Sequence, residues 1–154
     1  MKLARMIYVC SLFVLLLMAI PLSAQDLPKD YQEVLTSLAR TGDYKPKVLK
    51  VNVPRNDLHL IEVGAAINAR MRLNSWAAFA GNDADAQVAG DIAMRESEVN
   101  AVLKALRSHG LNIVAIHNHM LDTHPTVIFL HYWGRGPAPK LAAGFRSALD
   151  VLGK

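Results

Sequence analysis

Cysteine is almost absent from this chain of 154 residues, which contains a single one, Cys10. Cys10 lies inside an apolar segment near the amino terminus, Met6 to Ile20. If processing removes that segment, the remaining chain can form no disulfide and no thiolate metal site, and it has no cysteine nucleophile. The absence of thiol chemistry directs attention to histidines and carboxylates.

A long apolar run is also lacking, because the amino-terminal one is shorter than the roughly 20 residues that a membrane-spanning helix needs. It follows Lys2 and Arg5 and precedes a proline and small residues that end at Ala24. This order is typical of a secretory signal peptide, with an uncleaved anchor as the second choice. We therefore predict a signal peptide at residues 1–24, a periplasmic or secreted protein, and no stable membrane anchor after cleavage.

Clustered charge and recognised catalytic motifs are missing as well. Lys and Arg number 17 against 13 Asp and Glu, and two of the basic residues, Lys2 and Arg5, belong to the expected signal peptide. Because no basic stripe is present, the composition argues against a nucleic-acid partner. Ser75 is not surrounded by the G-x-S-x-G pattern of serine hydrolases.

The remainder, residues 25–154, has the usual size of one domain and contains no internal repeat. Hydrophobic periodicity predicts helices at 29–41, 95–109 and 138–152. Apolar runs and alternation predict strands at 47–55, 58–63, 71–81, 86–94, 111–119 and 126–134. This order favours a single α+β domain, a two-layer sandwich in which a largely antiparallel sheet of about six strands is covered by helices.

Several segments resemble the LppY/LpqO family of secreted bacterial proteins and lipoproteins. The similar segments are "NSWAAF", "VAGDIAM", "ESEVNAVLKALRSHGLNIVAIHNHML" and "FLHYWGRGPAPKLAAGFRSALD". The resemblance covers Val48 to Leu152, and its most specific part is the His-Asn-His segment. It implies export and a shared fold unit, but no reaction, because the family's function is uncharacterised. Family members usually carry an acidic residue near position 124, where this chain has His124.

Four of the six histidines fall in one short region, His117, His119, His124 and His131. Residues two apart on a strand share a face, so His117 and His119 should point the same way, together with Ile113 and Ala115. On the next strand, Val127, Phe129, His131 and Trp133 should share a face.

The register of the hairpin determines whether His131 lies on the same face as His117. If it places His131 on the face of His117, three imidazoles converge on a common point, with His124 as a further candidate ligand. Imidazole binds zinc, copper, nickel and iron, and zinc is the first choice for such a site. The alternative is structural: each histidine then lies half-buried at the edge of the sheet and bonds a backbone carbonyl or a carboxylate.

Two carboxylates are candidates for a catalytic role. Asp91 shares its strand face with the small residues Ala89 and Ala93, so it has room to ligate a metal, act as a general base or orient a histidine. It could equally bond backbone near the helix that follows. Glu62 alternates with Leu58 and Leu60, and an inward carboxylate there would need a partner.

Three classes of function stay open on these grounds. The first is an exported domain of unknown specific function that binds a metal ion or small ligand through the histidine cluster. The second is a metal-dependent hydrolase that uses a metal-bound water, with Asp91 or Glu62 as the base. The third is a partner-binding domain whose histidines are purely structural. Homo-oligomerisation is compatible with each.

Overall fold

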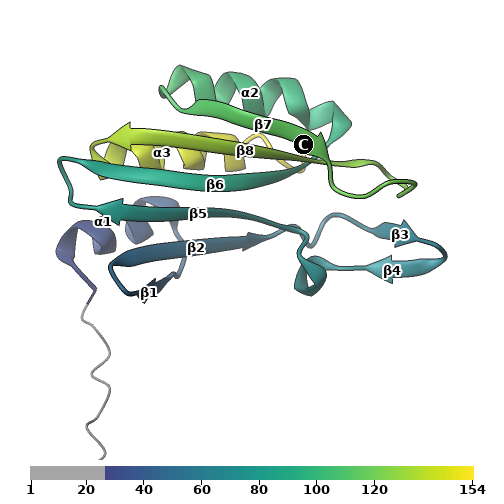
Figure 1. The fold of residues 1–154 in the computed structure, drawn as a ribbon, viewed down its shortest axis with the longest axis horizontal. Helices are drawn as coiled ribbons and strands as arrows, with labels where there is room; N and C mark the ends of the chain where they lie inside the picture. Colours follow the sequence, from purple (N-terminus) through teal and green to yellow (C-terminus); the bar gives the residue numbers. More distant parts are fainter. Residues whose placement is uncertain (1–26) are drawn as a thin grey trace, which may run out of the picture.

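A computed structural model describes residues 27–154 of the chain (Figure 1). The predicted signal peptide lies outside these residues. The helices are α1 (Lys29–Leu38), α2 (Val99–Ser108) and α3 (Ala138–Leu149), with 3-10 turns η1 (Ala69–Met71) and η2 (Glu96–Glu98). The strands are β1 (Asp43–Lys45), β2 (Val48–Pro54), β3 (Leu60–Glu62), β4 (Ala65–Ile67), β5 (Asn74–Gly81), β6 (Ala86–Arg95), β7 (Asn112–Asn118) and β8 (Val127–Gly136).

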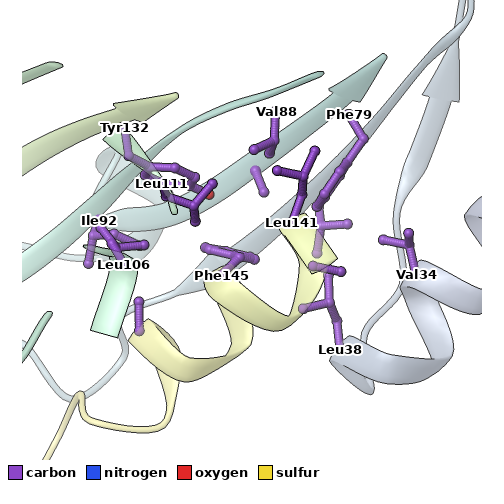
Figure 2. Packing of buried hydrophobic residues seen from close by; sticks show 14 of the residues in the cluster. Val34, Leu38, Phe79, Val88, Ile92, Leu106, Leu111, Tyr132, Leu141 and Phe145 are labelled. Carbon is purple, nitrogen blue, oxygen red and sulfur yellow. The ribbon is translucent and has the colours of Figure 1, made fainter. Parts of the chain in front are cut away.

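Six strands form one antiparallel sheet in the order β1-β2-β5-β6-β8-β7, so β7 is an edge strand. Buried side chains of α1, α2 and α3 form one core with the inward residues of this sheet, and Figure 2 shows part of it between α1, α3 and the strands. The predicted α+β sandwich is therefore confirmed. Within residues 27–154, no helix combines the length and apolar character needed to cross a membrane.

The strand expected at 58–63 takes a different place from the one that its alternation suggested. It forms β3, which pairs with β4 in a separate two-stranded hairpin beyond the end of β2 (Figure 1). The sixth sheet strand is β1, which is too short to show alternation. The chain leaves the sheet at Arg55 and returns at Leu73, and we call residues 55–73 the excursion.

The excursion covers one end of the sheet face opposite the helices. Its apolar residues and those of two strands form a second, smaller core, which consists of Leu58, Leu60, Ile67, Leu73, Ala93, Val127 and Phe129. No helix of residues 27–154 lies over the rest of that face (Figure 1). We call this uncovered part the open face.

A buried ion network attaches the excursion to the body of the domain. Arg55 and Glu98 are each only 3% exposed, and the Arg55 Nη2 atom lies 3.0 Å from both carboxylate oxygens of Glu98. Arg55 also donates to the carbonyl of Ala93 and to Asp57. Glu98 in turn accepts the backbone N–H groups of Arg95 and Gly153, at 2.7 Å each. One carboxylate thus links the excursion, the start of α2 and the carboxyl-terminal turn.

The absence of a side chain at Gly90 makes room for the ring of Tyr132, which lies on the helix side of the sheet. A Cβ atom at Gly90 would overlap the Trp76 carbonyl oxygen and the Tyr132 ring. Because Gly90 has no Cβ atom, the Tyr132 ring lies over it, and the Tyr132 hydroxyl donates to the Trp76 carbonyl at 3.2 Å. This bond fixes the backbone of Trp76, whose side chain lies on the open face.

Candidate functional site

A row of five residues crosses the open face from one strand to the next. The strand register places Asn52, Trp76, Asp91, His131 and Ala115 opposite one another on β2, β5, β6, β8 and β7. The three in the middle of the row, Trp76, Asp91 and His131, carry the polar groups that form its centre. The side chain of Asp91 is 15% exposed and that of His131 is 41% exposed, so solvent reaches the histidine.

Hydrogen bonds connect the row into a chain that ends on the edge strand. The indole Nε1 of Trp76 donates to Asp91 Oδ2 at 2.9 Å. The other carboxylate oxygen, Oδ1, contacts His131 Nδ1. His131 Nε2 lies 2.9 Å from His117 Nε2, and His117 Nδ1 lies 2.9 Å from the carbonyl oxygen of Asn118.

The partners of the two imidazoles determine where their protons lie. A carboxylate and a carbonyl oxygen only accept hydrogen bonds, so His131 Nδ1 and His117 Nδ1 must each donate. In a neutral imidazole the other ring nitrogen then carries a bare lone pair. The two Nε2 lone pairs therefore face each other at 2.9 Å, which is favourable only when a proton or a metal cation lies between them.

The spacing of this pair, which we call the His117–His131 pair, is close to that of two ligands on one ion. Nitrogens bound to tetrahedral zinc at about 2.0–2.1 Å are separated by about 3.4 Å, so a small ring rotation accommodates the ion. The contact between Asp91 and His131 Nδ1 also matches the carboxylate–histidine arrangement that orients metal-bound imidazoles. Two imidazole nitrogens at this spacing could serve as two of the ligands of a divalent metal ion.

His119 lies on the same face but is held apart from the pair. Its ring stacks on Phe129 with centroids 4.4 Å apart, whereas the His117 ring lies 6.3 Å from that of Phe129. Burial lowers the pKa of His119 below its ordinary value of 6.5, and the neighbouring His117 lowers it further. Within residues 27–154, no three histidine, cysteine or acidic side chains are grouped as metal ligands.

The face predicted for Ile113 is wrong, and a β-bulge is the reason. The register shifts between Ile113 and Ala115, so that Ile113 lies opposite Tyr132 and packs against the helix-side core. Ala115 lies opposite His131 on the open face. The extra residue, Val114, is 64% exposed.

Two further candidates, His124 and Glu62, lie away from the hydrogen bonds that link Asp91, His131 and His117. The backbone of His124 forms an isolated bridge with Ile61, and this bridge attaches the β7–β8 loop to the excursion. Glu62 lies on β3 in the excursion, where its Oε2 atom is buried and has no hydrogen-bond partner among residues 27–154. Neither side chain takes part in the hydrogen bonds of the His117–His131 pair.

A pocket of about 260 Å³ opens beside Asp91 and His131. Trp76 and Trp133 line it together with Ala89 and Val114, so apolar surface surrounds the polar chain. On the far side of Trp76, Lys50 Nζ lies 4.4 Å from the centre of the indole ring. The sequence indicated Asp91 and the histidines, but not Trp76 and Lys50.

This fold and site define an α+β domain with an Asp–His–His chain on an open sheet face. Residues 32–151 match a domain family described as Domain of Unknown Function (DUF1259), and the chain belongs to that family. No curated protein matches the chain. No solved structure matches it either.

Proposed function

We propose that this protein is an exported domain of the LppY/LpqO type that binds a divalent metal ion, zinc by preference, through the His117–His131 pair. The observation that carries the proposal is the approach of two Nε2 atoms to 2.9 Å when both Nδ1 atoms already donate. Asp91 orients His131, and His119 is a nearby neutral imidazole. A bound zinc ion would polarise a water or small ligand in the adjoining pocket.

The geometry supports a binding module over the hydrolase alternative. A general base must reach the water that it deprotonates. Both oxygens of Asp91 already accept hydrogen bonds, from Trp76 and His131. Glu62 takes no part in this chain. The purely structural alternative accounts for the bond from His117 to Asn118, but it accounts for the opposed Nε2 atoms only when a proton is shared between them.

Zinc should bind metal-free protein, purified without a polyhistidine tag, at one ion per chain and raise its melting temperature. A ligand that binds only the folded state adds about 2.7 kcal/mol of stability at roughly 100 times its Kd. Calorimetric titration and thermal melting at pH 7.5 would measure both effects. His117→Ala should weaken binding at least about tenfold, since half of the pair is lost.

His59→Ala provides the matched control, because it removes an exposed histidine from the excursion and should leave zinc binding unchanged. The zinc effect should also fade below about pH 6, where protons compete for imidazole lone pairs. Absence of binding by zinc, copper, nickel and cobalt, or equal binding by wild type and His117→Ala, would contradict the proposal.

The export part of the proposal rests on residues 1–24, with their basic start, apolar run and small residues before the cleavage position. Mass spectrometry of protein from the native host should find a chain that starts at Gln25. An intact amino terminus that stays with the membrane fraction would contradict cleavage.

A further inference from the structure

A second hollow, of about 500 Å³, lies on the same sheet face between β2, the start of β5 and the η1 turn. Its polar lining consists of Lys50, Arg70 and Arg72 together with the amides Asn52, Asn56 and Asn74. In the part of the chain that the structure describes, no acidic residue lines it. We call it the basic groove.

The charges of the basic groove are not neutralised within the described part of the chain. Four other arginines, Arg55, Arg95, Arg135 and Arg146, pair with carboxylates of the described residues, whereas Arg40 and Arg107 do not. None of the three groove cations forms an ion pair among residues 27–154. A cleft lined by charges of one sign concentrates counter-ions, so the groove attracts anions.

The backbone of Arg72 has a conformation that is unusual for arginine. Arg72 has a φ of 79°, in the left-handed region, where it ends the η1 turn and donates its N–H to the Ala69 carbonyl. Glycine adopts this conformation without steric strain, whereas a residue with a Cβ atom is strained. With arginine at this position the folded protein is less stable than it would be with glycine. The arginine adds an unpaired charge to the groove.

Trp76 lies between the groove and the pocket beside Asp91 and His131. Lys50 Nζ lies over one side of the indole ring, and the indole Nε1 donates to Asp91. Asn52 lies opposite Trp76 in the strand register. The groove and the His117–His131 pair therefore lie on one face of the sheet, with Trp76 and Asp91 between them.

We propose that the basic groove binds an oxyanion, the phosphate or carboxylate group of a small ligand. Arginine presents several N–H donors in a plane that matches the oxygens of these groups, and Lys50 adds a point charge. The three asparagine amides supply uncharged donors. This binding needs no metal, so it stands or falls separately from the function proposed above.

Calorimetric titration of the metal-free protein at low ionic strength, with inorganic pyrophosphate and with citrate in separate experiments, tests the proposal. Wild type should bind at least one of the two, and added salt should weaken that binding. Arg70→Ala/Arg72→Ala should lose at least about tenfold in affinity, as expected for charge-assisted hydrogen bonds. Binding of pyrophosphate alone identifies a phosphate site, and binding of citrate alone identifies a carboxylate site.

Lys104→Ala/Arg107→Ala is the matched control, because it removes the same charge from exposed positions on α2 and should bind the anion as wild type does. His131→Ala should also keep anion binding, which separates the groove from the metal site. Arg72→Gly should melt no lower than wild type yet bind the anion more weakly. No binding of either anion by wild type, or equal losses in the groove and control variants, would overturn the proposal.

Discussion

Glu98→Ala should lower the free energy of unfolding by about 3–5 kcal/mol, the usual effect of removing one partner from a buried ion pair. The loss leaves the guanidinium of Arg55, which is 3% exposed, without its buried counter-charge. It also removes the acceptor of the Arg95 and Gly153 backbone N–H groups. Chemical denaturation followed by circular dichroism would measure the change.

Glu96→Ala is the matched control for this variant. Glu96 lies in the same 3-10 turn but is exposed, so its removal should change stability by less than about 1 kcal/mol. Similar stabilities for the two variants would contradict the role assigned to Glu98.

The same ion network predicts how the stability of the wild-type protein depends on pH. Hydrogen bonding from Arg55 lowers the pKa of Asp57 from 3.8 to about 2. Because the folded-state pKa lies below the unfolded one, the contribution of Asp57 is complete above 3.8 and is lost as the pH falls through 2.

Asp91→Asn should weaken zinc binding by about 10–100-fold, the usual effect of losing the group that orients a metal-bound histidine. Both partners of the Asp91 carboxylate, Trp76 Nε1 and His131 Nδ1, are donors. An asparagine side chain offers one acceptor and one donor, so it satisfies only one of them in the present arrangement. If the amide N–H faces His131, the ring proton moves to Nε2, where it blocks the lone pair that faces His117.

Nitrogen NMR of the imidazoles separates this mechanism from a general loss of structure, because it reports which ring nitrogen of His131 carries the proton. Asp122→Asn is the matched control. It removes one negative charge from the β7–β8 loop, at a φ of 58° that asparagine tolerates. Unchanged zinc affinity in Asp91→Asn, or an equal loss in Asp122→Asn, would contradict the positioning role.

The alternation of residues along a strand correctly predicted which histidines share a face of the sheet. It put His117 and His119 on one face, and it put His131 with Phe129 and Trp133 on the neighbouring strand. The strands predicted at 71–81 and 86–94 leave only residues 82–85 for the turn between them. Antiparallel pairing that is symmetric about this turn places Trp76 opposite Asp91, as the structure shows.

Other features depend on tertiary contacts that leave no local pattern. The bulge at Val114 lies in an unbroken apolar run, and nothing in that run marks the change of face. The alternation of Leu58 and Leu60 correctly indicates burial, but the core that buries them is the second one under the excursion. The basic groove brings together Lys50 and Arg72, which become neighbours only because β2 pairs directly with β5.

The position of β7 at the edge of the sheet has a consequence for the motions of the site. An edge strand has a hydrogen-bonded neighbour on one side only, so it is among the first elements to open in local unfolding. His117 lies on this strand and His131 on the interior strand β8, so opening of the ladder separates the two rings. A cation held by both rings would oppose that opening. The order of β7 and the occupancy of the pair are then coupled, and amide exchange along Asn112–Asn118 reports on both.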